Sequence, residues 1–180
     1  MTATTSTTYL WTPPPVYSLP VRGRSERLPI HRLFFVGRNY HAHAVEMGRP
    51  VDKSVEVPFY FTKATSTLVE SGATVAYPPG TQNYHHEMEL VLAIGAPGFR
   101  VSEADAPRLV YGYACGLDMT RRDLQMKMRE QGRPWEIGKA FDFSAPIAPL
   151  RTLAEVGEIN GGEIRLEVDG EVRQLSLIHI

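Results

Sequence analysis

Cysteine is almost absent from this chain of 180 residues, because Cys115 is the only one. A single cysteine excludes an internal disulfide framework and fits a reducing compartment. The sequence also lacks an apolar run of membrane-spanning length, and its Thr-rich start has neither the basic nor the apolar region of a secretory signal. We therefore expect a cytoplasmic protein that does not bind membranes.

An excess of charge is missing as well, since 19 Lys and Arg stand against 20 Asp and Glu. A balanced chain has no broad positive field for nucleic acid, which leaves small neutral or acidic molecules as the expected partners. Gly-rich phosphate loops, Ser-centred nucleophile motifs and Cys/His metal spacings are absent too. The length and a hydrophobic content of 43% fit one globular domain with a sizeable core.

The pattern along the chain favours an α+β fold. Residues 1–28 are rich in Thr and Pro, which predicts an extended arm or a short lead-in strand. The turn pair Asp169-Gly170 between alternating segments predicts a hairpin. Apolar, β-branched runs predict further strands at 30–36, 58–62, 74–77 and 85–94. Strands thus outnumber helices, and regular crossover helices do not join them.

Three helices are expected from capping signals. Ser102 with Asp105 resembles a capping box for a helix that runs toward Tyr111. Thr120 with Asp123 resembles another, for a helix that ends at Gly132. A shorter helix is expected from Asn39 to Gly48.

Glu87 and Glu89 are the most informative pair in the sequence, because a strand directs two side chains at this spacing to the same side. Two such carboxylates repel each other unless a cation lies between them. Asp118, in a turn before the helix predicted from Thr120, is the best candidate for a third ligand. Three carboxylates suit Mg²⁺ or Mn²⁺, and less exclusively Ca²⁺. An amphipathic strand with an acidic outer face and an ordinary turn aspartate would give the same pattern.

Other polar residues are candidates for catalysis. His43 and Glu46 would share one face of a helix, where the carboxylate would orient the imidazole as a general base for water. Lys139 lies in an aromatic setting and could approach a substrate oxygen. Arg122 and Gln125, with the neighbouring Arg121, could bind a substrate carboxylate. Each of these residues would also fit an ordinary solvated surface.

Several motifs in a fixed order resemble the fumarylacetoacetate hydrolase family, most closely its fumarylpyruvate hydrolase and acylpyruvase branch. The resemblance runs from about His31 to Gln174. It is carried by Val36-Gly37-Arg38-Asn39-Tyr40 with His43 and Glu46, Phe61-Thr62-Lys63, His86-Glu87-Met88-Glu89-Leu90, Gly116-Leu117-Asp118-Met119-Thr120-Arg121-Arg122-Asp123-Leu124-Gln125, Gly132-Arg133-Pro134-Trp135 and Lys139-Ala140-Phe141-Asp142.

The resemblance implies a mixed β-roll that pairs as a homodimer and holds Mg²⁺ or Mn²⁺. It implies a metal site at Glu87, Glu89 and Asp118. It also implies a catalytic set of His43, Glu46 and Lys139, and substrate contacts at Arg38, Tyr40, Arg122 and Gln125.

The expected reaction is hydrolysis of a carbon–carbon bond in a 2,4-dioxo acid. Fumarylpyruvate, an intermediate of gentisate breakdown, would give fumarate and pyruvate. The same groups would also suit an oxaloacetate decarboxylase or a dienoate isomerase. A non-catalytic metal-binding subunit is a further alternative.

The sequence departs from the family after Gln174. The family continues with a strand-rich segment bearing a Thr-Gly-Thr-Pro type motif, whereas residues 175–180 read like the translation of a transposon-end sequencing adapter. We therefore expect an arm at 1–28, a partial catalytic domain at 29–174 and a non-native tail at 175–180. A domain shortened in this way would expose unpaired backbone and apolar surface. We therefore expect this chain to aggregate and to be inactive.

Overall fold

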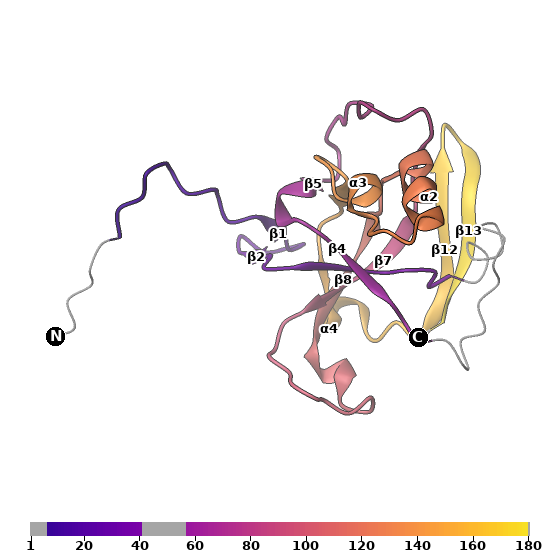
Figure 1. The fold of residues 1–180 in the computed structure, drawn as a ribbon. Helices are drawn as coiled ribbons and strands as arrows, with labels where there is room; N and C mark the ends of the chain where they lie inside the picture. Colours follow the sequence, from indigo (N-terminus) through magenta and orange to yellow (C-terminus); the bar gives the residue numbers. More distant parts are fainter. Residues whose placement is uncertain (1–6, 41–56, 180) are drawn as a thin grey trace.

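A five-stranded sheet organises the part of the chain that the computed structural model describes, residues 7–40 and 57–179. Its central strand, β8 (Val110–Leu117), pairs antiparallel with β7 (Met88–Ile94) along one edge. Along its other edge β8 pairs with two short strands, β10 (Ala145–Ile147) and β11 (Arg151–Thr152). β5 (Leu68–Glu70) extends the sheet parallel to β10. Figure 1 shows β7 and β8 in the middle of the molecule.

Two-stranded antiparallel pairs surround this sheet. They are β1 (Ser18–Pro20) with β2 (Arg27–Pro29), β3 (Leu33–Val36) with β4 (Tyr60–Lys63), β6 (Tyr84–His85) with β9 (Thr120–Arg121), and β12 (Gly161–Val168) with β13 (Glu171–His179). The predicted strands at 30–36 and 58–62 thus exist in shortened or shifted form. The predicted strand at 85–94 is divided into β6 and β7, because these two halves pair with different strands.

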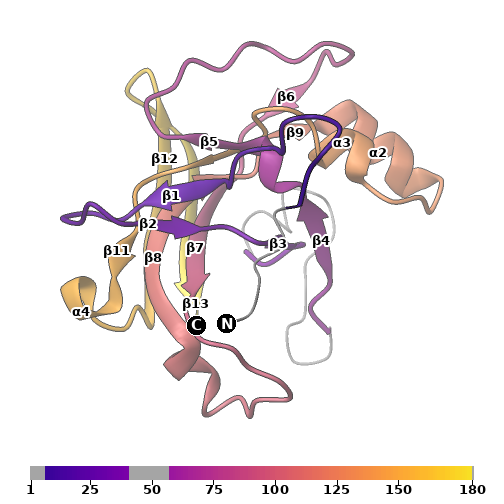
Figure 2. The same ribbon diagram turned by 90° about the vertical axis from the view of Figure 1, so that its left-hand side faces the viewer.

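The helices in the described part of the chain are short. They are α2 (Arg122–Glu130), α3 (Glu136–Lys139) and α4 (Leu153–Val156), with 3-10 turns at Thr65–Thr67 and Ala106–Leu109. In Figure 2, α2 and α3 lie on the side of the molecule opposite the β1–β2 hairpin and α4. No helix among the described residues is long and apolar enough to cross a membrane.

The hydrophobic core lies where the N-terminal hairpin meets the sheet. Val21 forms a parallel bridge with Leu150, and the backbone N–H of Arg22 donates to the Leu150 carbonyl at 2.8 Å. The buried apolar side chains are those of Leu19, Val21, Ala93, Ala114, Ile147 and Leu150. Of the two alternatives for residues 1–28, a lead-in strand is therefore present at β1. The expected boundary after residue 28 runs through β2, so this hairpin belongs to the folded body.

The strand predicted at 74–77 is wrong. Those residues form no ladder, and β5, six residues earlier in the chain, supplies the edge beside β10 instead. Pro78 and Pro79 follow the segment, and neither has a backbone N–H to donate to a neighbouring strand. Tyr77 packs edge-to-face on the ring of Tyr84, with ring centroids 5.3 Å apart.

Two of the predicted helix starts need correction. The Ser102–Asp105 contact forms, with the Asp105 N–H donating to the Ser102 hydroxyl at 3.2 Å, but only the 3-10 turn at Ala106–Leu109 follows before β8 begins. Thr120 does not cap α2, because it lies in β9. The Asp123 carboxylate accepts instead from the Thr81 hydroxyl at 2.6 Å. The end of α2 near Gly132, whose φ is +62°, agrees with the prediction. The helix expected from Asn39 to Gly48 falls mostly outside the described residues.

The predicted hairpin is confirmed. Asp169 and Gly170 have φ of +54° and +81°, as a tight turn between twisted strands requires.

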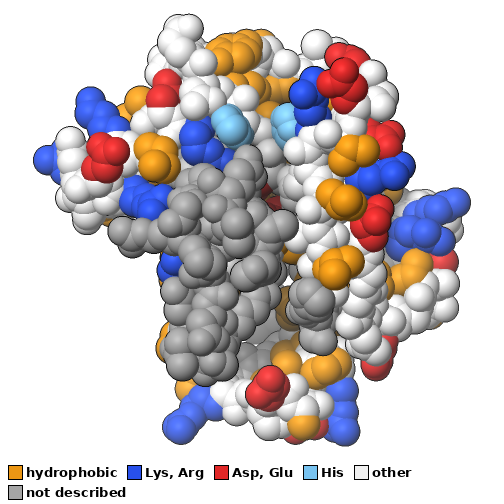
Figure 3. Space-filling view, turned by 90° about the vertical axis from the view of Figure 1, so that its right-hand side faces the viewer, with side chains coloured by type: hydrophobic (Ala, Val, Ile, Leu, Met, Phe, Trp, Pro, Cys, Tyr) orange, Lys and Arg blue, Asp and Glu red, His pale blue; other side chains and the backbone are white. Residues whose placement is uncertain are grey.

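Residues 175–179, predicted as a non-native tail, continue β13 and pair with residues 161–165. A ladder joins backbone groups that every residue except proline carries, so this pairing does not test the origin of the tail, which stays a prediction. On the face of the molecule seen in Figure 3, hydrophobic side chains stand between charged ones.

Candidate active site

The register of β7 and β8 brings two acidic side chains together. Glu87 precedes β7 and Asp118 follows β8, and the Asp118 N–H donates to the Glu87 carbonyl at 2.8 Å. The strand pairing continues with Glu89 opposite Gly116. Both Glu87 and Asp118 are buried, with Asp118 only 2% exposed. Two of the three predicted metal-ligand positions, Glu87 and Asp118, thus lie together at one end of the β7–β8 pair.

Lys139 lies between these carboxylates. Its ammonium donates to Glu87 Oε2 at 2.8 Å and to Asp118 Oδ2 at 2.7 Å. A third bond, at 2.7 Å, goes to the Thr120 hydroxyl. Lys139 ends α3, and Gly138 before it lets α3 approach α2, because a Cβ at this position would lie 2.8 Å from the backbone nitrogen of Gln125. The residue is 1% exposed, so the site is built around a buried cation.

A second buried lysine, Lys63, was not among the predicted site residues. Its ammonium lies 2.9 Å from Asp118 Oδ1 and donates to the backbone carbonyls of Met119, Lys139 and Ser144. These bonds tie the end of β4 to both segments that supply the site. The sequence feature that could have indicated Lys63 is its position at the end of the predicted apolar strand, in the motif Phe61-Thr62-Lys63.

Arg122 and Gln125 form the other side of the cluster. The Arg122 guanidinium lies 2.6 Å from Glu87 Oε1 and also donates to the Gln125 side chain. Both residues are buried at the start of α2. Arg122 was predicted to bind a substrate carboxylate, whereas here it holds a carboxylate of the protein.

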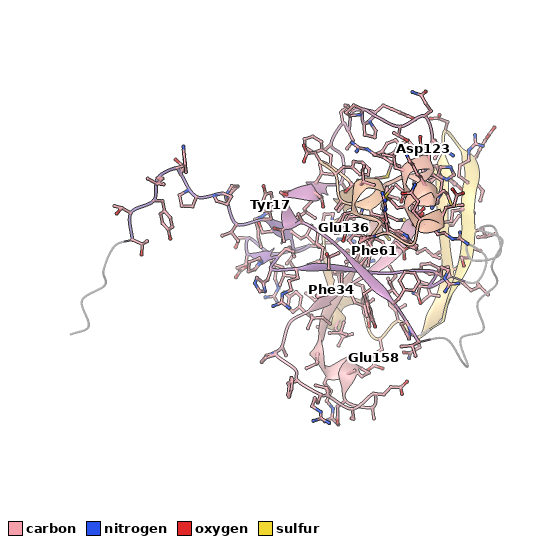
Figure 4. The ribbon with its side chains drawn as sticks, viewed as in Figure 1. Tyr17, Phe34, Phe61, Asp123, Glu136 and Glu158 are labelled. Atoms are coloured by element: carbon pink, nitrogen blue, oxygen red, sulfur yellow. The ribbon has the colours of Figure 1, made fainter. Side chains whose placement is uncertain are left out.

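A cavity of about 210 Å³ opens above the cluster. Glu87, Asp118 and Lys139 contribute to its lining, and so do the basic residues Arg38 and Arg129. Its apolar walls include Phe59, Phe61 and Trp135, and the Trp135 ring contacts both phenylalanine rings. In Figure 4, Phe61 of β4 lies below α3, which begins at the labelled Glu136. A polar floor with aromatic walls suits a small planar acid.

Two pKa shifts reflect this crowding. Burial raises the pKa of Glu89 well above its usual value, and the charges of Asp118 and Glu87 raise it further. Burial lowers the pKa of Lys63 to about 8, although the Asp118 carboxylate opposes that shift. Burial is thus the main cause of both shifts, and the neighbouring carboxylates add to the shift of Glu89.

The donor set fits a hard divalent cation, because Glu87, Glu89 and Asp118 offer only carboxylate oxygens and repel one another. Within residues 7–40 and 57–179, however, no three acidic, His or Cys side chains already stand in a metal-binding arrangement. Lys139 bridges two of the three carboxylates. The metal-ligand assignment therefore stays a prediction.

The remaining predicted residues are placed as follows. Arg38 has φ of +53° and its guanidinium lies over the Phe59 ring, 5.6 Å from the centroid. Tyr40 does not line the cavity; its hydroxyl accepts from the Leu90 N–H at 3.0 Å. His43 and Glu46 lie outside the described residues. Arg129, four residues after Gln125 on α2, lines the cavity and was missed, although helical spacing could have indicated it.

Comparison with known proteins gives a consistent result. The sequence profile of the family described as "Fumarylacetoacetate (FAA) hydrolase C-terminal" matches residues 32–178. A fumarylpyruvate hydrolase of a Ralstonia species is 61% identical over 133 residues, which cover 72% of this chain and 67% of the relative. A mitochondrial oxaloacetate tautomerase of Arabidopsis thaliana is 41% identical over 146 residues, covering 81% of this chain and 64% of the relative. This chain thus spans about two thirds of these relatives.

Solved structures of related proteins have the same fold as this chain. The crystal structure of a fumarylpyruvate hydrolase from Pseudomonas aeruginosa, in complex with Mn²⁺ and pyruvate, is 51% identical, with a TM-score of 0.88. The match covers 94% of this chain and 74% of that one. A 5-carboxymethyl-2-hydroxymuconate delta-isomerase from Mycobacterium smegmatis is 33% identical, with a TM-score of 0.66, over 83% of this chain and 57% of the other. The predicted α+β fold with short helices is confirmed.

Proposed function

Because this chain belongs to the fumarylacetoacetate hydrolase family, we propose that it hydrolyses a carbon–carbon bond of a 2,4-dioxo acid, with fumarylpyruvate as the substrate. The products would be fumarate and pyruvate, as in gentisate-type aromatic catabolism. The observation that carries the proposal is the convergence of Glu87, Asp118 and Lys139 at the floor of a cavity with aromatic and basic walls. The 61% identical relative supports this choice of substrate.

We infer that Glu87, Glu89 and Asp118 hold Mg²⁺ or Mn²⁺, and Ca²⁺ would also suit their oxygen atoms. Such an ion supplies a Lewis acid for the 2-oxo acid end of the substrate. The Mn²⁺ and pyruvate bound to the Pseudomonas aeruginosa enzyme support both parts of this inference.

The side chains divide the rest of the chemistry. His43, oriented by Glu46, would remove a proton from a water molecule, and the oxygen of that water would attack the 4-carbonyl carbon. The bond between that carbon and C3 then breaks, and C3 keeps the electron pair and gains a proton, which leaves pyruvate and the acid. One water is consumed, so the atoms balance. Arg38, whose guanidinium lies beside the cavity, and Arg129 would attract the carboxylates of the substrate.

Lys139 would donate a hydrogen bond to the oxyanion that forms at the attacked carbonyl. An ammonium has three N–H donors, and those of Lys139 already serve Glu87, Asp118 and Thr120. Donation to the substrate therefore requires the exchange of one of these bonds. A cation that neutralises the two carboxylates would make that exchange easier.

The test is pyruvate release from fumarylpyruvate with and without Mn²⁺ or Mg²⁺. This chain should be assayed beside a version extended with the C-terminal segment of the Pseudomonas aeruginosa relative. We expect equimolar fumarate and pyruvate from the extended version with metal, and a loss of at least about 100-fold in Asp118→Asn. No release by an extended version that folds and binds metal would contradict the proposal.

A second candidate is conversion of oxaloacetate, because an oxaloacetate tautomerase is 41% identical to this chain. Tautomerase, decarboxylase and dienoate isomerase assays on the same preparations would separate these activities from hydrolysis. The cytoplasmic location and the homodimer also remain proposals. Sedimentation velocity of both versions would test the dimer.

A further inference from the structure

The outer edge of β7 is bound by two side chains from distant parts of the chain. Among the described residues, β7 pairs with β8 along one edge only. On the other edge, the Met88 N–H donates to Gln174 Oε1 at 2.6 Å, and Gln174 Nε2 donates to the Met88 carbonyl at 2.9 Å. Two residues further along the same edge, the Leu90 N–H donates to the Tyr40 hydroxyl. These side chains thus satisfy backbone groups that an edge strand would leave unpaired.

The hairpin presents Gln174 to β7 by strand alternation. Gln174 pairs with Leu166 across the hairpin, and the next pair on the same face, Ile164 with Ser176, is buried. The neighbouring Leu175 points the other way and is exposed. Both ribbon views place the hairpin beside β7 (Figures 1 and 2). A primary amide carries one acceptor and two donors, so it can replace a neighbouring strand at Met88.

Met88 is the residue between Glu87 and Glu89. We propose that Gln174 is a positioning residue, whose amide fixes both backbone polar groups of Met88 and so holds the two flanking carboxylates on one face. An uncharged amide does this without adding charge to acidic groups that already repel each other. The proposal goes beyond the family's proposed metal site by naming what orients it, and it rests on that site for its effect on metal binding.

The test compares three variants of this chain. Gln174→Met keeps the side-chain length and loses both hydrogen bonds. Ile164→Val weakens the packing of the same hairpin face but leaves the hydrogen bonds between Met88 and Gln174 in place, and Arg173→Ala alters an exposed neighbour. Calorimetric titration with Mn²⁺ should show about 10-fold weaker binding in Gln174→Met, as for partners that orient metal ligands elsewhere. Arg173→Ala and Ile164→Val should bind as the parent chain does. Equal losses in Gln174→Met and Ile164→Val, at equal Tm, would overturn the proposal.

Amide exchange at Met88, measured by NMR without metal, separates this proposal from the proposed function. We expect protection in the parent chain and exchange at least about 10-fold faster in Gln174→Met, with Ile164→Val close to the parent. Unchanged Met88 exchange in Gln174→Met would overturn the positioning role, whatever the metal does. If the parent chain binds no Mn²⁺ while Met88 exchange still depends on Gln174, the proposed metal site is contradicted. The positioning of Met88 by Gln174 is then still supported.

Discussion

The apolar core and the charged cluster of this chain are both buried, but opposite interactions hold them. The core unites the β1–β2 hairpin with the sheet through small and aliphatic side chains, with Leu150 fully buried. The cluster lies at the end of the β7–β8 pair, and its members are Lys63, Glu87, Asp118, Arg122 and Lys139. Strand β8 serves both, because Ala114 faces the core and Asp118 follows its last residue.

The difference lies in what each region gains from burial. Each apolar side chain in the core gains about 25 cal/mol for every Å² removed from water. A buried ion loses its hydration, and its partners return that energy only when the geometry is good. Well-packed apolar residues would serve stability equally well at the cluster. Buried charges beside a cavity are therefore better explained by chemistry than by stability.

The largest effect should come from Lys63→Met, which removes a buried cation but keeps the length of the side chain. Asp118 would lose one of its ion pairs, and three backbone carbonyls would lose a donor. We expect a loss of about 3–5 kcal/mol in the free energy of unfolding, together with weaker Mn²⁺ binding. Urea unfolding and calorimetric titration measure the two. A change under about 1 kcal/mol would remove the contrast between the regions.

Leu150→Ala breaks the core instead and should cost about 3 kcal/mol, because it leaves a cavity beside Leu19 and Val21. No charge changes, so the affinity of the folded protein for Mn²⁺ should stay that of the parent chain. Urea unfolding gives the first value and titration below the unfolding transition gives the second. An affinity loss as large as that in Lys63→Met would show that the regions are not independent.

The smallest effect should come from Glu89→Gln. Because the folded chain raises the pKa of Glu89, it binds a proton there more tightly than the unfolded chain does. This carboxyl's stabilising contribution is therefore present below its ordinary pKa of 4.5 and is lost as the pH rises through the folded value. Glutamine lacks this dependence, so the metal-free variant should gain about 1 kcal/mol at pH 7, or roughly 3 °C in Tm. Its Mn²⁺ binding should fall.

Thermal scans of both proteins from pH 4 to pH 8 test this sign. The difference in Tm should shrink toward acidic pH, where Glu89 is protonated in both states. A difference that instead widens toward pH 4 would mean that the cations around Glu89 outweigh its burial.

Local patterns were sufficient for the elements that depend on neighbours in the sequence. Asp169-Gly170 specified the hairpin, since only its own backbone angles had to be satisfied. The 74–77 segment was mispredicted because a strand also needs a free edge, and β5 supplies the edge beside β10. Thr120 was mispredicted as a cap because β6 pairs with it as a strand.

The sequence by itself determined the family, the α+β class and the acidic residues on which the proposed chemistry depends, because motifs and alternation are readable along one chain. Only the tertiary structure decided that Lys63 braces Asp118, that Arg122 binds Glu87 and that Gln174 binds the backbone between the two glutamates. These partners are far apart in sequence, and a local pattern of residues does not predict which distant side chains will be in contact. Their pairing depends on how the strands pack, so it exists only after the chain has folded.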